Sequence, residues 1–304
     1  MFDVAVLGPG GVGGFLAAAL ANARVPTLVV GREPTAREIA ERGIAVESER
    51  LGAFRAEPGA ATALTLPVDV LIVAPKARDL EAALERVETE PGLALPLLNG
   101  LDHMTVLRER FGSRAVSGSI RIEAYRTDAT HVVQTSPFLR IDMASADPAM
   151  APRMDALAGV LDGAGVPARV MDSEAQALWG KLVRLNALAL VTSAYDLRLG
   201  PIRATPELRD ELRACVREGV AVATAEGARV ELAATLAELD DAHASLGTSM
   251  QRDIAAGVEP ELDAIAGSVL RAAARHGIEC PTIERLTERV AARAGVRVTA
   301  ALPR

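Results

Sequence analysis

A glycine-rich run near the N-terminus has the spacing that binds a dinucleotide. Gly8, Gly10 and Gly13 form Gly-x-Gly-x-x-Gly, with Gly11 and Val12 between the last two. Glycines at these places let the backbone turn tightly and approach a pyrophosphate, whose charge then meets the N–H groups at the start of the next helix. These five residues are predicted to bind a nicotinamide dinucleotide, although the motif alone does not specify the reaction.

Arg32 is the residue that bears on the choice between the two nicotinamide cofactors. Sites that prefer NAD usually end the second strand with Asp or Glu, which binds the 2′-hydroxyl of the ribose. Here the second predicted strand is followed by Gly31 and Arg32, with Glu33 one place later. A guanidinium pairs with a 2′-phosphate through two hydrogen bonds, whereas a carboxylate in its place would repel that group. We therefore expect NADPH as the cofactor.

Lys181 carries an ammonium group on a predicted helix face that is otherwise largely apolar. At about 100° per residue, Leu178, Leu185 and Leu188 fall near it around the helix. Desolvation there would lower the pKa of the lysine, as a general acid requires. The spacing leaves a second interpretation open, in which the side chain extends to solvent and has no chemical role.

Two further polar residues directly follow predicted strands. Lys76 comes after the strand Val68–Ala74, and Asn99 comes after the strand Ala94–Leu98. Open α/β sheets bind their ligands at the carboxyl ends of the strands, so both side chains are expected to reach a cofactor cleft. For each residue taken alone, a solvated loop lysine and a simple Asn-Gly turn are the alternatives.

The elements that must position these residues follow two different patterns. Up to about residue 172, short β-branched runs such as Val4–Leu7 and Thr27–Val30 alternate with helix-forming segments. From Ser173 onward, long Ala- and Leu-rich helical segments replace the strands. We predict an α/β protein with an N-terminal Rossmann-type, doubly wound parallel sheet that binds NADP in residues 1–172. Residues 173–304 are predicted to form an all-α domain that holds substrate and catalytic groups.

Taken together, the glycine run, Arg32 and four short segments lie in an order that spans nearly the whole chain. The segments are Ala74–Lys76, Leu98–Gly100, Trp179–Leu182 and Thr248–Ile254. In this combination the chain resembles the ketopantoate reductase (2-dehydropantoate 2-reductase) family. The resemblance implies an oxidoreductase that reduces a 2-oxo acid with NADPH, most simply ketopantoate to pantoate in pantothenate biosynthesis.

The resemblance also implies a role for each matching residue. Lys181 matches the catalytic lysine that protonates the ketone oxygen as hydride arrives. Glu261 matches the acidic residue that binds the substrate hydroxyl and positions the lysine, and Ser249 matches a ligand of the substrate carboxylate. Asn99 would lie between nicotinamide and substrate, and Lys76 would lie near the cofactor.

The helix that carries the lysine departs from the family pattern. Many members have Asn four residues after the lysine, where this chain has Leu185, and a further Asn at the place of Ala189. Asn186 lies about 140° away from the lysine around the helix. A lost hydrogen bond to substrate would cost on the order of 1–3 kcal/mol, so another 2-oxo acid is an open alternative. Glu259 competes with Glu261 for its role, but its spacing differs by two residues.

Composition and charge argue against several other classes of protein. With 33 Lys and Arg against 40 Asp and Glu, a net charge of −7 and 3% aromatic residues, nucleic-acid binding is not expected. Cys215 and Cys280 stand 65 residues apart without a CxxC, so neither a disulfide framework nor a metal site is expected, and a reducing cytoplasm fits. The uncharged residues 4–23 are interrupted by Gly8–Gly11, which argues against a membrane span or a signal peptide.

Two other functions stay open at this point. A relative of the β-hydroxyacid dehydrogenases would use NAD on another substrate, and a sensor would bind NADP(H) without turnover. The expected partner is a small-molecule 2-oxo acid. The Ala- and Leu-rich C-terminal helices fit a homodimer interface as well as the core of a monomer.

Overall fold

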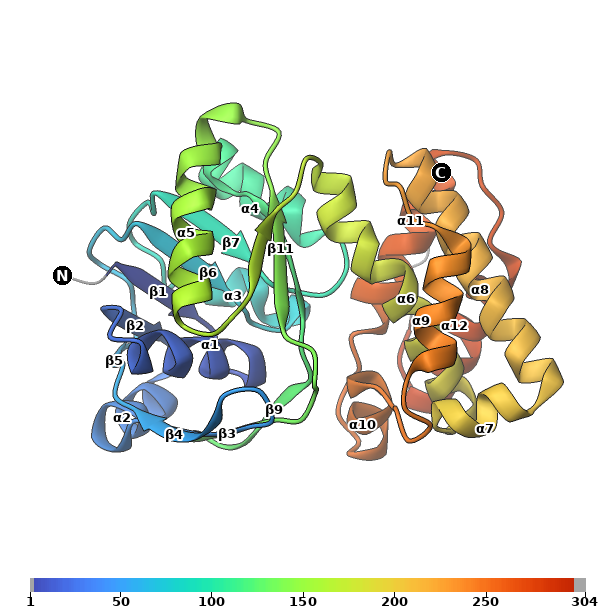
Figure 1. The fold of residues 1–304 in the computed structure, drawn as a ribbon, viewed down its shortest axis with the longest axis horizontal. Coiled ribbons are helices and arrows are strands. Elements are labelled where there is room, and N and C mark those ends of the chain that lie inside the picture. The colour runs from blue at the N-terminus through green and yellow to red at the C-terminus, as the bar shows by residue number, and fades with distance from the viewer. Residues whose placement is uncertain (1–2, 298–304) are drawn as a thin grey trace. The chain divides into compact units, whose positions relative to one another are not determined.

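A parallel sheet built around the strand before the glycine run forms the centre of the N-terminal part (Figure 1). The computed structural model describes residues 3–297. The strands of this sheet are β1 (Val4–Leu7), β2 (Thr27–Val30), β5 (Gly59–Ala61), β6 (Val70–Val73) and β7 (Leu93–Pro96). Their order is β5-β2-β1-β6-β7 and all neighbouring pairs are parallel, so the predicted doubly wound parallel sheet is confirmed.

Both faces of the parallel sheet are buried. Val4 and Val6 belong to one hydrophobic cluster, whereas Ala5 and Leu7 belong to another on the opposite face. This follows from the two-residue period of a strand, and it explains why β1 is apolar throughout. The helices that accompany the sheet, together with two 3₁₀ turns, are α1 (Gly11–Asn22), α2 (Glu33–Arg42), η1 (Ala77–Asp79), α3 (Leu80–Leu84), α4 (His103–Phe111) and η2 (Gly112–Arg114).

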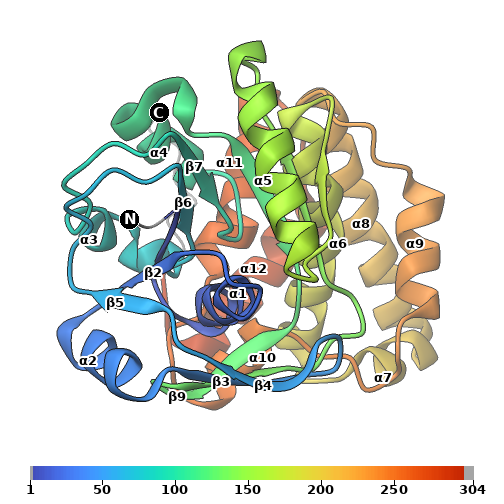
Figure 2. The ribbon, with the colours of Figure 1, turned by 60° about the vertical axis from the view of Figure 1, so that its left-hand side comes forward.

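Two smaller sheets complete the α/β part. The first has the order β4-β3-β10-β9, and its strands are β3 (Ile44–Ser48), β4 (Gly52–Ala56), β9 (Ala124–Asp128) and β10 (His131–Gln134). Its β3–β4 pair is an antiparallel hairpin, and α1 packs on this sheet (Figure 2). The second has the order β12-β11-β8, and its strands are β8 (Ser117–Arg121), β11 (Arg140–Ala144) and β12 (Ala168–Val170). Between β11 and β12 the chain forms η3 (Pro148–Met150) and α5 (Ala151–Gly163), and α5 packs with β12.

The C-terminal part contains helices and no strand among the residues described up to 297. Its elements are α6 (Glu174–Tyr195), α7 (Leu199–Ala204), α8 (Pro206–Ala225), α9 (Leu232–Asp241), α10 (Ser249–Ala255), the π-helix η4 (Asp263–Gly267), α11 (Ser268–Arg275) and α12 (Pro281–Ala294). Helix α8 packs with α7, α9, α11 and α12, and its buried residues include Leu212, Val216 and Val222. The all-α C-terminal part predicted from the sequence is confirmed.

The chain forms two compact units, and each unit is made of two separate segments of the sequence. The α/β unit comprises residues up to 98 and 103–177, and the helical unit comprises residues 99–102 and those from 178 onward. The change of unit therefore falls inside α6, five residues after the predicted domain limit at 172. The four residues 99–102 belong to the helical unit because they pack on its helices, although β7 precedes them in the chain.

A π-helix lies at the start of the helical segment that continues into α11. The described backbone has η4 at Asp263–Gly267 and resumes as α11 at Ser268. Helical periodicity in the sequence does not distinguish an α-turn from a π-turn, which holds one more residue. Such turns occur frequently at functional sites, and this one begins two residues after Glu261, which is predicted to act in catalysis.

Candidate active site

The glycine run forms the turn between β1 and α1, and its glycines differ in the space that a side chain would find there. Gly8 has φ +87°, and a Cβ there would lie 2.7 Å from the backbone nitrogen of Pro75. A Cβ on Gly13 would overlap the carbonyl oxygen of Gly8, so this glycine permits the close approach of α1 to the strand. By contrast, nothing lies within 4 Å of a Cβ placed on Gly10. The backbone is thus open at Gly10, where a phosphate would approach.

The start of α1 is suited to an anion. Gly10 is the N-cap residue, no side chain caps the helix, and its first turn holds no acidic residue. The N–H groups of Gly11 and Val12 lie in that first turn, at the positive end of the helix dipole. All five residues predicted from the glycine motif therefore fall in one strand–turn–helix segment, which is the arrangement that the motif requires.

Strand β9 lies alongside the glycine run, and this contact was not predicted from the sequence. A Cβ on Gly11 would overlap the carbonyl oxygen of Ala124, and the Arg126 guanidinium donates a hydrogen bond of 2.9 Å to the carbonyl of Pro9. The strand Ala124–Asp128 is short and polar, so it carries no apolar alternation that would reveal it. Arg126 adds a cation beside the predicted phosphate site.

Arg32 and Lys76 lie at the ends of the two strands that flank β1. Arg32 is the N-cap residue of α2, directly after β2, and its side chain is 73% exposed. Lys76 is half-buried and is the N-cap residue of η1, after β6. Nη2 of Arg32 lies 3.2 Å from Oδ1 of Asp79, a partner that sequence reasoning missed. Asp79 follows Lys76 by three residues, but nothing in that spacing predicts its contact with Arg32.

In the helical unit, three predicted residues form one hydrogen-bonded chain. Nζ of Lys181 donates to Oδ1 of Asn99 at 2.8 Å, and Nδ2 of Asn99 donates to Oε2 of Glu261 at 3.0 Å. An ammonium only donates and a carboxylate only accepts, so both partners demand the same orientation of the amide. These two hydrogen bonds bring together the lysine, the amide and the acid that the resemblance assigns to one site.

The loop that carries Asn99 is fixed to η4 and α11. Gly100 has φ +85°, and a Cβ there would overlap the carbonyl oxygen of Ala264 in η4. Arg271 donates to Asp102 at 2.6 Å and to Asp263 at 3.0 Å, so one guanidinium joins the loop to the π-helix. These contacts explain why residues 99–102 belong to the helical unit, and sequence reasoning did not identify Arg271.

Ser249 lies apart from this hydrogen-bonded chain. It is the exposed first residue of α10, and its hydroxyl makes no hydrogen bond to another described residue. The preceding Thr248 accepts a hydrogen bond of 3.2 Å from the backbone of Gln251 and lies 3.2 Å from the hydroxyl of Thr192. The amide of Gln251 donates to Asp196 and lowers the pKa of that carboxyl group. Neighbouring residues therefore hold the start of α10 and leave the Ser249 hydroxyl accessible.

The residues that depart from the family pattern lie on the same helix as the lysine. Leu185 is half-buried and Ala189 is buried. Asn186 is also buried, and its Nδ2 lies 4.0 Å from Sγ of Cys215 in α8. Asn186 therefore contacts α8, and it does not replace the missing amide next to Lys181.

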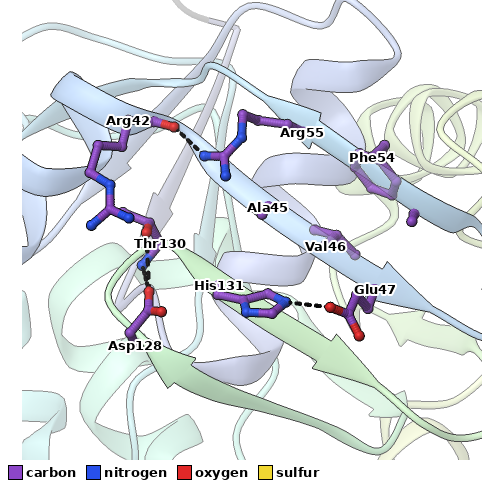
Figure 3. Close-up of a pocket in the computed structure, with 10 residues that line it drawn as sticks. Arg42, Ala45, Val46, Glu47, Phe54, Arg55, Asp128, Thr130 and His131 are labelled. Atoms are coloured by element: carbon purple, nitrogen blue, oxygen red, sulfur yellow. Dashed lines mark hydrogen bonds and ion pairs between the residues drawn. The ribbon is translucent and has the colours of Figure 1, made fainter.

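A pocket of about 490 Å³ lies on the small sheet that contains β3, β4 and β10 (Figure 3). None of the predicted site residues lines it. Its charged groups already interact within the pocket: Nε2 of His131 lies 3.1 Å from Oε1 of Glu47, and Asp128 accepts a hydrogen bond from the backbone of Thr130 that lowers its pKa. We assign no chemistry to this pocket.

Residues 3–297 contain neither a candidate metal site nor a candidate membrane span. No group of three or more His, Cys, Asp or Glu in this range is placed to hold a metal ion. No helix in the same range is both long and apolar enough to cross a membrane. Cys215 and Cys280 are buried and unpaired.

Known proteins are similar to this chain over most of its length. The family model for ketopantoate reductase PanE/ApbA matches residues 4–147, and the model for its C-terminal part matches residues 175–294. The 2-dehydropantoate 2-reductase of Mycobacterium tuberculosis is 31% identical over 299 residues, which cover 95% of this chain and 97% of that protein.

Two solved structures illustrate the range of similar folds. The structure of 2-dehydropantoate 2-reductase from Geobacter metallireducens GS-15 has a TM-score of 0.86 at 26% identity, and the match covers 94% of this chain and 98% of that one. The structure of a D-mandelate dehydrogenase with NADH and anilino(oxo)acetate also has a TM-score of 0.86, at 19% identity, over 96% and 98% of the two chains. At that identity, the second likeness concerns the fold alone.

Proposed function

Because this chain belongs to the ketopantoate reductase family of oxidoreductases, we propose that it reduces a 2-oxo acid to the 2-hydroxy acid with NADPH. The first candidate for the substrate is ketopantoate, which would place the enzyme in pantothenate biosynthesis. The observation that carries the proposal is the hydrogen-bonded chain from Lys181 through Asn99 to Glu261. The two buried, unpaired thiols suit a reducing cytoplasm, where we place the reaction.

The residues of the α/β unit fit a dinucleotide. The open backbone at Gly10 and the uncapped start of α1 suit a pyrophosphate, and Arg32 at the end of β2 suits a 2′-phosphate. Arg126 adds positive charge at Pro9, and Lys76 follows Pro75, which packs against Gly8. When bound, NADPH would supply the hydride that reduces the carbonyl carbon.

The residues of the helical unit fit the other half of the reaction. As the carbonyl carbon gains a hydride, its π-electron pair moves to oxygen, and the Lys181 ammonium stabilises that charge and gives it a proton. Asn99 holds Nζ by accepting one of its hydrogen bonds, and Glu261 fixes the orientation of the Asn99 amide. Lys181 then recovers its proton from solvent. Ser249 would bind the substrate carboxylate through its accessible hydroxyl.

The direct test follows NADPH oxidation with ketopantoate and with a panel of other 2-oxo acids. Wild type is compared with Lys181→Met, which keeps the length of the side chain and removes its charge. We expect turnover by wild type and a loss of about 10²–10⁴-fold in kcat for the variant. Equal turnover by the two proteins would refute the role of Lys181.

The same assay separates the alternative functions. Turnover of the panel but not of ketopantoate would favour another 2-oxo acid, as Leu185 and Ala189 in place of two amides suggest. Turnover with NAD that is insensitive to Arg32→Ala would favour a β-hydroxyacid dehydrogenase type. Tight NADPH binding without turnover of any 2-oxo acid would favour a sensor.

A further inference from the structure

Asp79 links two arginines at the edge of the predicted cofactor site. Its Oδ1 lies 3.2 Å from Nη2 of Arg32, and its Oδ2 lies 3.9 Å from Nε of Arg78. Arg32 follows β2, whereas Arg78 and Asp79 belong to η1 after β6. The carboxylate therefore joins the two loops that follow the strands on either side of β1.

These two loops also contact the glycine run between them. A Cβ on Gly31, next to Arg32, would lie 3.1 Å from the Pro9 side chain, and a Cβ on Gly8 would lie 2.7 Å from Pro75. In a fold of this kind the ribose next to the adenine lies at the end of the second strand. Asp79 thus contacts the guanidinium that is placed to meet a 2′-phosphate.

We infer that Asp79 weakens the preference of this protein for NADPH over NADH. The inference rests on the proposed nicotinamide cofactor and concerns the selectivity of that same site. A 2′-phosphate carries up to two negative charges, and it must compete with the Asp79 carboxylate for Arg32. The 2′-hydroxyl of NADH carries no charge and meets no such opposition.

The exposure of the pair sets the size of the effect. The Arg32 and Asp79 side chains are 73% and 39% exposed, so their ion pair is weak and Arg32 can turn toward a ligand at little cost. After Arg32 turns, the charge of Asp79 stays close to the phosphate and repels it. Repulsion between exposed charges a few ångströms apart corresponds to roughly a threefold to thirtyfold change in affinity.

The test measures the dissociation constants of NADPH and NADH by fluorescence titration for wild type, Asp79→Asn and Glu85→Gln. Asp79→Asn removes the negative charge and keeps the shape of the side chain. Glu85→Gln, at the exposed end of α3, removes the same charge farther along the chain and serves as the matched control. Titrations at low salt and at about 0.5 M salt test whether the effect is screened.

We expect Asp79→Asn to raise the ratio of the two constants, Kd(NADH) over Kd(NADPH), about tenfold at low salt and less at high salt. The Kd of NADH for Asp79→Asn should stay within about twofold of the wild-type value. For Glu85→Gln, the dissociation constants of both nucleotides should stay within the same range. An unchanged ratio would overturn the inference. A fall in the ratio would also overturn it, since the carboxylate would then hold Arg32 in its binding position.

Turnover of 2-oxo acids by the same samples keeps this result separate from the proposed reaction. If the ratio rises as expected and no 2-oxo acid is reduced, the inference holds and the proposed reaction fails. If the acids are reduced and the ratio does not change, the reaction holds and the inference fails. Absence of binding of both nucleotides to all three proteins would overturn both.

Discussion

At the scale of single residues, the Asn99 amide connects Lys181 to Glu261 through two hydrogen bonds. The amide has an acceptor on one side and donors on the other, which matches a lysine and a carboxylate. A hydrogen bond to a charged group contributes about 1.5–3 kcal/mol, so the loss of either contact should be measurable in activity. Asn99 therefore offers a test of the hydrogen-bonded chain that leaves Lys181 and Glu261 unchanged.

Replacing Asn99 by Asp should make activity depend on pH in a new way. The new carboxylate would lie about 3 Å from that of Glu261, and repulsion would raise the pKa of one of the two. Below that raised pKa one carboxyl group is protonated and donates to the other, as the amide does in wild type. We expect kcat/KM of Asn99→Asp to rise relative to wild type as the pH falls from about 8 to about 5.5.

Asn99→Leu serves as the control, because it has no group to protonate. Its kcat/KM should fall about 10–100-fold at every pH, without recovery at low pH. Parallel pH profiles for the Asp and Leu variants would contradict the assigned hydrogen-bonded chain.

Two glycines of the nucleotide loop should respond differently to the same substitution. A Cβ on Gly13 overlaps the carbonyl oxygen of Gly8, so Gly13→Ala should lower the free energy of unfolding by about 1–3 kcal/mol. A Cβ on Gly10 meets nothing within 4 Å, so Gly10→Ala should fold with nearly unchanged stability and lose affinity for the cofactor. Urea unfolding and NADPH titration of both variants measure this contrast. Equal destabilisation by the two substitutions would contradict the steric assignment.

At the scale of elements, the short loop 99–102 takes its position from η4 and α11. The two carboxylates of Asp102 and Asp263 converge on Arg271, whose side chain is 21% exposed. Hydrogen bonds to both carboxylates raise the pKa of Arg271 against the opposing effect of burial, so the guanidinium stays charged. The Arg271 guanidinium therefore helps to hold the loop that carries Asn99 against the π-helix.

Removing the Arg271 guanidinium should reduce activity because the loop that carries Asn99 is then held less firmly. Arg271→Met leaves two carboxylates without their shared cation, and we expect kcat to fall about 5–20-fold with a smaller effect on the KM of NADPH. Arg271→Lys should recover part of the activity. Arg275→Met is the matched control: Arg275 lies one turn farther along α11 and pairs with Glu226, away from the loop. A similar loss of kcat in the control would indicate a general weakening of α11.

At the scale of the whole molecule, two buried thiols report on the unfolding of the helical unit. Cys215 is fully buried, and its pKa is raised by burial; burial also raises the pKa of Cys280 to about 12. Both thiols therefore stay protonated and protected in the folded protein at neutral pH, whereas in the unfolded chain their pKa values return to about 8.5.

The raised thiol pKa values give stability a defined dependence on pH. Below about pH 8.5 both states hold the proton and the contribution to stability is complete. Between about pH 9 and 12 the unfolded thiol ionises while the folded one does not, so the free energy of unfolding falls as pH rises. We expect Cys280→Ala to reduce this slope by up to about 1.4 kcal/mol per pH unit, measured by urea unfolding with a reductant present. Identical slopes in the two proteins would contradict the raised pKa.

The amino-acid sequence is enough to predict the class of the fold and to nominate residues for the candidate site. Strand and helix periods are local properties, so the alternating first part and the helical second part could be predicted, as could the glycine turn between β1 and α1. The order of the motifs also indicates the ketopantoate reductase family, to which the family models assign the chain. Lys181 and Glu261 were predicted as members of one site because the family pattern spans both.

The contacts between side chains, by contrast, follow from the three-dimensional fold. Strand β9 beside the glycine run, the Arg32–Asp79 pair and the Arg271 contacts join residues far apart in the chain, and no local period encodes such pairs. Residues 99–102 belong to the helical unit because Gly100 packs closely against Ala264, and no local period encodes the π-turn of η4 either. Side-chain position depends on packing between elements, and packing is set by the whole fold rather than by neighbours in sequence.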